Sequence, residues 1–258
     1  MLKTCSSVLA AASLVVTSYA GPIYAGKIVS YHPGVGYSVN FTHPEAALGE
    51  PARVNPYGEV ADPFNPPYGT NQIVSIGAGG WLTVRFEQPI LNHPRNIDHL
   101  DFTIFGNTGF IITNEFDLTT FDWIGTPATD GSLFGQSTGE TRVSVSFDGR
   151  HFFTLNPALA PSVDSFPPTD GAGDFRVPLD PKLSSADFAG ATLADIRGRY
   201  DGSGGGASFD ISWAQDAKGR PVWLPMIRFV RIDVLSGKAE IDGLAAVGRL
   251  PWWWNYKQ

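Results

Sequence analysis

The chain has 258 residues, a formal net charge of −7 and only 17% charged residues, which excludes a coiled coil and a highly charged disordered chain. Its 29 glycines and 20 prolines exceed average usage and favour a β-rich fold with many turns. The acidic balance argues against nucleic acid or anionic lipid as the main partner, and it is compatible with cations and neutral sugars.

The first twenty residues have the features of a secretory signal peptide. Lys3 supplies a positive charge, residues 8–16 form an apolar run, and residues 18–20 (Ser-Tyr-Ala) form a small-x-small cleavage site. We therefore expect a protein that is secreted to the extracellular space, the cell surface or the periplasm. The lone cysteine, Cys5, lies within this leader, so the mature chain is expected to have no disulfide and no thiolate metal site. No later apolar run reaches the ~20 residues of a membrane-spanning helix.

The remaining chain, residues 21–258, is predicted to form a single β-sandwich domain. Short runs of apolar residues, several alternating with polar ones, predict its strands. These runs are residues 27–31, 72–76, 81–86, 100–105, 110–112, 142–155, 208–213, 226–235 and 239–247. Many short strands joined by long crossings indicate an all-β sandwich with a jelly-roll topology and at most one or two short helices.

The strongest strand signal lies in residues 142–155. Val143, Val145 and Phe147 alternate with serines, as expected for a strand with one buried face. Asp148-Gly149 is expected to close a two-residue hairpin, because both residue types tolerate the left-handed backbone region.

Other segments are expected to depart from strand structure. Residues 43–51 are predicted to form one helical turn or a compact loop, and residues 183–196 are predicted to be a helix with a cap near Ser184. Residues 122–140 are expected to form a surface loop, and residues 156–182 a crossing rich in turn residues.

Six segments carry a resemblance to a known family. They are ALGEP (47–51), VSIGAGGWLTVRF (74–86), DFTIFGN (101–107), VSVSFDGRHFFTL (143–155), GGGASFDISWA (204–214) and the pair FVRIDV (229–234) and AEIDGLAAV (239–247). Together they resemble a bacterial family of secreted cell-surface, PEP-CTERM-associated proteins. Their order is also similar to that of discoidin-like, galactose-binding-like sandwiches. The resemblance implies secretion and a β-sandwich, but no defined activity; the hydrophobic sorting tail common in the family is not seen in this sequence.

The discoidin-like resemblance also implies a structural calcium site. Glu240 and Asp242 lie two residues apart in the predicted last strand, so they project from the same face. In discoidin-like folds an acidic residue on this strand and carbonyls of an early loop hold calcium. The resemblance implies residues 46–49 as that loop here, with Ala47 and Leu48 as ligands and Glu50 as a further candidate. Calcium prefers such a mixture of carboxylate and carbonyl oxygens. The alternative is that both carboxylates are solvated at a sheet edge.

Tryptophans in or beside predicted loops are candidates for carbohydrate binding, because an aromatic face stacks on a sugar ring. These residues are Trp123, Trp213 and Trp223. The alternative for most tryptophans is core packing, which we expect for Trp81 at the start of a strand.

Polar residues in otherwise apolar strands form a second ligand-binding candidate. Asp101, Asn107 and Asp210 belong to this group, because a buried carboxylate must be paired, hydrogen-bonded or bound to a metal. The alternative is that they face outward on half-solvated strands.

Catalytic patterns are weak in this sequence. Residues 135–139 match G-x-S-x-G, but they do not lie between a strand and a helix, as a nucleophile elbow requires. The first hypothesis is therefore a secreted, non-catalytic domain that binds extracellular carbohydrate and carries a structural calcium ion. The second is a structural or adhesive cell-surface protein that binds another protein, and the third is a glycan-active hydrolase or lyase. The oligomeric state stays open.

Overall fold

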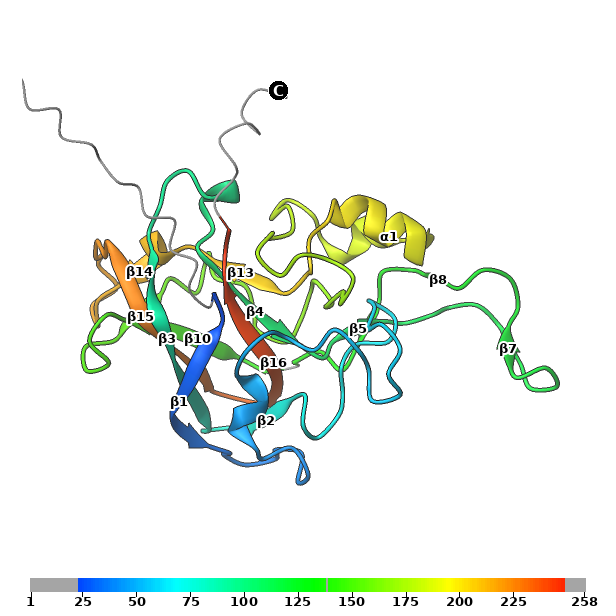
Figure 1. Cartoon of the computed structure of the whole chain (residues 1–258), viewed down its shortest axis with the longest axis horizontal. Helices are drawn as coiled ribbons and strands as arrows, with labels where there is room; N and C mark the ends of the chain where they lie inside the picture. The colour runs from blue at the N-terminus through cyan, green and yellow to red at the C-terminus, as the bar shows by residue number, and fades with distance from the viewer. Residues whose placement is uncertain (1–22, 138, 249–258) are drawn as a thin grey trace, which may run out of the picture.

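The computed structural model describes residues 23–137 and 139–248, so the predicted signal peptide lies outside the described residues. Two antiparallel sheets form the framework (Figure 1). The larger sheet has the order β1 (Ala25–His32), β3 (Trp81–Leu91), β15 (Met226–Val234), β10 (Thr141–Ser146), β11 (Phe153–Leu155) and β14 (Ala214–Gln215). The smaller sheet has the order β13 (Ala207–Phe209), β4 (Phe102–Gly106), β16 (Lys238–Ala246) and β2 (Val74–Gly77). The predicted all-β sandwich is confirmed, and the jelly-roll topology stays a prediction.

The main core lies between the two sheets. Alternate residues of the larger sheet, such as Leu82 and Val84 of β3, are buried in one apolar cluster with Ile104 of β4 and Ile241 and Leu244 of β16. Each fully buried aliphatic side chain of this kind stabilises the fold by roughly 1.5–3 kcal/mol. The period-two pattern read from the sequence therefore identifies the core-facing side chains.

The smaller sheet is buried on its outer face as well. Phe105 and Ala245 alternate with the core-facing residues, and they pack with Phe175 from the long crossing that follows β11. A further apolar cluster, which includes Phe110, Phe188 and Tyr200, lies beneath the helix α1 (Leu193–Tyr200). The connections between strands therefore form a third layer over the smaller sheet.

Short elements shape this layer and the loops. They are the 3-10 helices η1 (Pro44–Ala47), η2 (Ile97–His99), η3 (Ser185–Phe188) and η4 (Ile211–Trp213), and the pairs β5 (Gly109–Phe110) with β9 (Leu133–Phe134), β6 (Phe116–Asp117) with β7 (Asp122–Trp123) and β8 (Ala128–Thr129) with β12 (Ala191–Thr192). The β6–β7 hairpin extends away from the sandwich at one end of the molecule (Figure 1).

The predicted helix over residues 183–196 is wrong in its position. Ser184 caps the 3-10 helix η3, as the cap signal predicts, but Gly190 adopts a positive φ of 76° and ends that segment. Thr192 then caps α1 by accepting a hydrogen bond from the Asp195 amide, and Asp195 bonds back to Thr192. The second cap, Thr192, lies eight residues after Ser184 in an Ala-rich stretch, where propensity alone does not locate a helix start.

The predicted two-residue hairpin at Asp148-Gly149 is also wrong. The strands end at Ser146 and resume at Phe153, so the connection is longer. Asp148 organises it, since its Oδ1 accepts hydrogen bonds from the amides of Arg150 and His151. An aspartate that caps several turn amides favours a wider loop than the Asp-Gly pair predicts.

Candidate functional site

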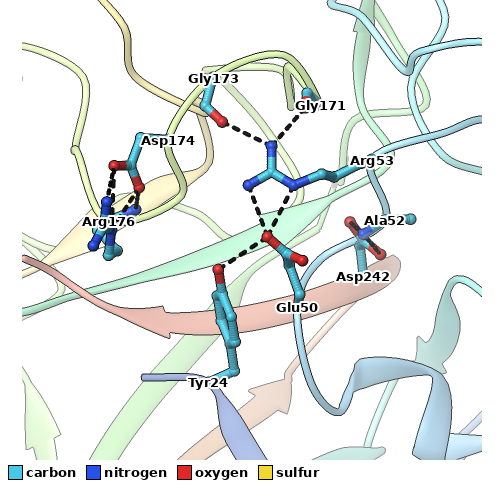
Figure 2. A network of polar contacts seen from close by, with 9 residues as sticks. All are labelled: Tyr24, Glu50, Ala52, Arg53, Gly171, Gly173, Asp174, Arg176 and Asp242. Carbon is cyan, nitrogen blue, oxygen red and sulfur yellow. Dashed lines mark hydrogen bonds and ion pairs between the residues drawn. The ribbon is translucent and has the colours of Figure 1, made fainter. Parts of the chain in front are cut away.

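An open pocket of about 410 Å³ lies where three separate segments of the described chain meet. The segments are the start of the described chain, the loop after η1 and the crossing near residue 174 (Figure 2). The residues around it are mostly polar. They are Ile23, Tyr24, Glu50, Arg53, Ala172, Gly173, Asp174 and Arg176.

Arg53 is the side chain that joins these segments. Its Nε and Nη2 lie 2.8 and 2.7 Å from Oε1 of Glu50, and its Nη1 donates to the carbonyls of Gly171 and Gly173 (Figure 2). The Tyr24 hydroxyl donates to the same Glu50 oxygen at 3.2 Å. The guanidinium of Arg53 is thus fixed in one orientation by partners on two loops.

A second ion pair completes the pocket wall. Arg176 donates from Nε and Nη2 to the two carboxylate oxygens of Asp174, at 2.9 and 2.6 Å. This bidentate geometry is the strong form of an arginine–carboxylate pair, and the hydrogen bonds from Arg176 hold the pKa of Asp174 below its usual range. The pocket therefore presents two guanidinium groups and two carboxylates whose charges are compensated in pairs.

Asp242 lies buried behind the loop that carries Glu50 and Arg53. Its carboxylate is 2% exposed, and both of its oxygens lie 3.0 Å from the amide nitrogen of Ala52 (Figure 2). Burial raises the pKa of Asp242 to about 8, because one amide hydrogen bond does not replace the water that an ionised carboxylate loses. The structure thus brings the last strand against the early loop, as the calcium hypothesis requires.

Glu240, two residues away on the same strand, has a different environment. Its Oε1 accepts from the Lys238 ammonium at 2.8 Å and the Ser38 hydroxyl at 2.6 Å, and its Oε2 accepts from the Asn107 amide at 2.8 Å. Burial acts to raise the pKa of Glu240, but hydrogen bonds from Lys238 and Ser38 outweigh it, so the pKa is lowered overall. A carboxylate with an ammonium partner is a poor ligand for a further cation.

The remaining predicted metal residues are dispersed. Ala47 is buried in the main core, Leu48 packs against that core, and Glu50 is paired with Arg53 in the pocket. Within residues 23–137 and 139–248, no group of three or more His, Cys, Asp or Glu side chains is arranged to hold a metal ion. Of the predicted acidic ligands, Asp242 alone combines burial with a single hydrogen-bond donor; Glu240 does not fit.

A third buried carboxylate, Asp164, was not predicted from the sequence. Its Oδ1 accepts from the amides of Asn107 and Thr108 and from the Thr108 hydroxyl, and its Oδ2 accepts from the Glu240 amide at 2.8 Å. Burial raises the pKa of Asp164 to about 7. The residue lies in a turn-rich crossing at a positive φ of 51°, so neither periodicity nor spacing marks it. It fixes the crossing to the ends of β4 and β16.

The three tryptophans proposed for carbohydrate binding do not share one surface. Trp123 is half-buried against Phe116 in the β6–β7 hairpin, with ring centroids 5.0 Å apart. Trp213 packs against the main core, whereas Trp223 is 79% exposed. β7 and β14, the strands next to these residues, lie at opposite ends of the molecule (Figure 1).

Trp81, expected in the core, lies half-buried on the outer face of the larger sheet.

The second candidate group, Asp101, Asn107 and Asp210, is divided between the two ends of β4. Asp101 is buried and accepts hydrogen bonds from the amides of His93 and Ile211, and burial raises its pKa to about 6. Asp210 caps η4 by accepting from the Ser212 amide at 2.6 Å. Asn107 instead contacts Glu240 at the far end of the strand. Asp101 is thus buried and hydrogen-bonded, which was one of the environments expected for it, and the hydrogen bonds of the three residues hold loops in place.

The pocket itself was missed because its residues come from segments far apart in the sequence. Tyr24, Arg53, Asp174 and Arg176 lie in stretches without strand or helix periodicity. The local signals were the opposite charges of Asp174 and Arg176 and of Glu50 and Arg53, which lie close enough in the sequence to pair within one loop. Only the fold assembles these side chains.

Comparisons with known proteins assign neither a family nor an activity. No family model matches the chain, and no curated protein sequence matches it at a significant level. Among the described residues, the helices are too short or too polar to cross a lipid bilayer.

Proposed function

We propose that this protein is a secreted, non-catalytic module that binds neutral carbohydrate in the pocket around Arg53 and Arg176. The observation that carries the proposal is the paired charge of the pocket, where each guanidinium is compensated by its own carboxylate. Such a site offers many hydrogen-bond donors and acceptors but little net charge. A neutral sugar matches it, because its hydroxyl groups both donate and accept.

The geometry of the pocket favours recognition of hydroxyl pairs. Arg176 and Asp174 present a planar fork, and Tyr24 and Glu50 present a hydroxyl and a carboxylate from the other two segments. Because these groups are already held by one another, little side-chain entropy is lost when a ligand binds.

The ionisation of the pocket favours binding over hydrolysis. Glycoside hydrolysis requires a carboxylic acid whose raised pKa keeps it protonated as a general acid. The pKa of Asp174 is instead lowered by Arg176, so this side chain is a carboxylate at neutral pH. Asp174 therefore cannot act as the protonated general acid that the hydrolase hypothesis requires.

The proposal includes a structural calcium ion at Asp242. A buried carboxylate with one amide donor requires either a proton or a cation, and a cation would compensate its charge at neutral pH. Asp242 would supply the carboxylate, and carbonyls of the early loop, at Ala47 or Leu48, would supply the neutral oxygens. Such an ion would fix the loop that positions Glu50 and Arg53.

The carbohydrate proposal is tested with immobilised neutral polysaccharides and affinity electrophoresis of the full chain. We expect Arg176→Ala to weaken retention at least tenfold, equivalent to about 1.4 kcal/mol. Arg220→Ala is the matched control, because Arg220 forms a similar pair with Asp216 on an exposed loop away from the pocket. No retention of the wild-type chain, or equal loss in both variants, would contradict the proposal.

The calcium proposal is tested by thermal unfolding with excess calcium and with chelator. Binding to the native state alone raises Tm, so we expect a calcium-dependent increase that Asp242→Asn abolishes. Glu240→Gln is expected to lower Tm in both conditions while preserving the calcium effect, because Glu240 pairs with Lys238. Identical curves with calcium and chelator would remove the ion from the proposal.

A further inference from the structure

The β6–β7 hairpin presents an exposed apolar tip. We name residues 113–127 the arm. Leu118 and Phe121 at its end are 76% and 78% exposed, and Phe116 and Ile124 are exposed beside them. Apolar side chains gathered on one protruding element mark an interaction surface more often than single scattered ones do.

Hydrogen bonds make the arm an ordered element. The Asn114 side chain donates to the carbonyls of Ile124 and Thr126 and accepts from the Ala128 amide, so it closes the base of the hairpin. At the tip, Phe121 adopts a positive φ of 56°, which costs a bulky residue on the order of 1–2 kcal/mol. The hairpin thus holds a large apolar ring in solvent at a conformational cost.

The arm is also uniformly acidic. It contains Glu115, Asp117 and Asp122, and no Lys, Arg or His occurs between His99 and Arg142. An acidic apolar tip is repelled by anionic lipid, so it fits a protein surface that is both apolar and basic.

Such a surface exists on the outer face of the larger sheet. We name the side chains Lys27, Trp81, Arg85, Arg142 and Arg231 the basic face; strand register places them on neighbouring strands β1, β3, β15 and β10. The Arg231 guanidinium lies over the Trp81 ring, 4.8 Å from its centroid. Ion pairs to Glu87 and Asp233 offset part of the charge, which leaves more cations than carboxylates.

The two surfaces lie far apart on one molecule. The arm forms one end of the long axis, and the larger sheet lies toward the other end (Figure 1). The arm therefore has no route to the basic face of its own chain, and a contact between the two must join separate molecules.

We propose that the arm of one copy docks on the basic face of a second copy. Leu118 and Phe121 contact the Trp81 region, while Glu115, Asp117 and Asp122 face Arg85 and Arg142. Because the two surfaces differ, the contact is heterologous, and a pair of copies retains one free face on the first copy and one free arm on the second. Repetition yields open chains of molecules, which suits the adhesive role considered above and does not depend on carbohydrate binding.

The test is sedimentation velocity of the full chain over a concentration series. A hairpin tip buries less area than a standard interface of about 1,600 Å², so we expect association on the order of 10–500 µM. The weight-average mass should rise beyond that of a dimer without a plateau. It should fall as salt increases, because salt screens the charge contacts.

Two variants each remove one of the two surfaces that form the contact. Leu118→Ser/Phe121→Ser removes the apolar tip, and Arg85→Ser/Arg142→Ser removes two cations from the basic face. We expect each variant alone to be monomeric at every concentration. An equimolar mixture should form 1:1 dimers and nothing larger, because one variant keeps its face and the other keeps its arm.

Two control variants test whether exposed apolar residues or cations elsewhere on the molecule also drive association. Val39→Ser/Leu159→Ser replaces two exposed apolar residues outside the arm, 77% and 55% exposed. Arg150→Ser/Lys218→Ser replaces two cations outside the basic face, and both variants should associate like the wild type. A wild-type chain that stays monomeric throughout overturns the proposal. A plateau at dimer that survives in the basic-face variant indicates arm-to-arm pairing and also overturns it.

Discussion

The two outer faces of the sandwich have similar strand patterns but different environments. On the larger sheet, Arg142 and Arg231 alternate with core residues and their side chains stay 46% and 30% exposed, although their common partner Asp233 is buried. On the smaller sheet, Glu240 and Asp242 alternate in the same way, yet connections between strands bury them. The comparison shows that alternation defines which side chains leave the core, whereas the connecting loops decide whether those side chains meet water.

The outer face of the smaller sheet also shows how the partners of a carboxylate control its pKa. Glu240 and Asp242 project from the same face of β16, but the pKa of Glu240 is lowered and that of Asp242 is raised to about 8. Burial acts on both in the same direction. The difference comes from Lys238, whose ammonium contacts Glu240, while Asp242 has one backbone amide. Burial of a carboxylate is therefore tolerated in two ways: by a paired cation or by a retained proton.

The largest expected loss of stability comes from removing Asp164, a buried carboxylate that accepts hydrogen bonds from three backbone amides. Asp164→Ala leaves the amides of Asn107, Thr108 and Glu240 without their acceptor and strains the positive φ at residue 164. We expect a loss of about 3–5 kcal/mol in the free energy of unfolding, measured by urea denaturation.

The control for this variant lies on the pocket rim. Asp174→Ala removes a partly exposed carboxylate paired with Arg176, and exposed pairs contribute about 1 kcal/mol or less. A similar cost for Asp164→Ala and Asp174→Ala would show that the outer face of the smaller sheet is hydrated, and the contrast between the two faces would fail.

The second effect is a dependence of stability on pH. The folded-state pKa values of Asp164 and Asp242 are raised to about 7 and about 8, above the value of about 3.9 expected in the unfolded chain. At pH values between the unfolded-state and folded-state pKa of each group, the folded chain holds a proton that the unfolded chain has released. The free energy of unfolding should therefore fall as pH rises from about 5 to 8, by up to about 1.4 kcal/mol per pH unit for each group.

Asp242→Asn isolates one of these groups. In chelator, the variant should lose the part of the slope that extends from pH 7 to pH 8, since Asp164 is by then mostly ionised. With calcium, the wild-type slope itself should flatten, because a bound cation replaces the proton on Asp242. Urea unfolding at pH 5, 7 and 8 measures both effects, and a wild-type stability that rises over this range would contradict them.

Much of the framework could be predicted from the sequence because strand alternation is a local property. The strands that contain Trp81, Phe102 and Val143 were each predicted, with their starts within two residues of the observed ones, although β3 runs on to Leu91. The predictions at Asp148 and at residues 183–196 were wrong because a single cap or turn residue redirected the chain there. Local signals thus located strands better than they located the connections.

The candidate site was less predictable because its chemistry depends on distant contacts. The discoidin-like resemblance implied a role for Asp242 near the early loop, but the contact of Asp242 with the Ala52 amide, its burial and the Lys238 partner of Glu240 required coordinates. Arg53 acquires its role only when the crossing places Gly171 and Gly173 against it. No pattern in a single sequence specifies such an encounter.

The third effect separates the two tryptophans near β14. Trp213 packs against the main core, so Trp213→Ala should cost about 2–4 kcal/mol through lost packing. Trp223 is largely exposed, so Trp223→Ala should change the free energy of unfolding by less than about 0.5 kcal/mol. Urea denaturation followed by far-UV circular dichroism compares the two, and equal costs would mean that Trp223 is covered in solution.

The smallest loss of stability is expected on the outer face of the larger sheet, where water weakens each contact. Arg231→Ala removes the stack on Trp81 and the hydrogen bonds to Asp233, and we expect a loss of about 0.5–1 kcal/mol. Arg231→Lys should recover less than half of that loss, because a lysine lacks the planar fork that both contacts use. Raising the salt concentration should shrink the cost of Arg231→Ala and leave the cost of Asp164→Ala unchanged, because salt screens exposed charges and not buried hydrogen bonds. If salt changed the cost of Asp164→Ala, or left the cost of Arg231→Ala unchanged, the two outer faces would differ in sequence but not in their exposure to water.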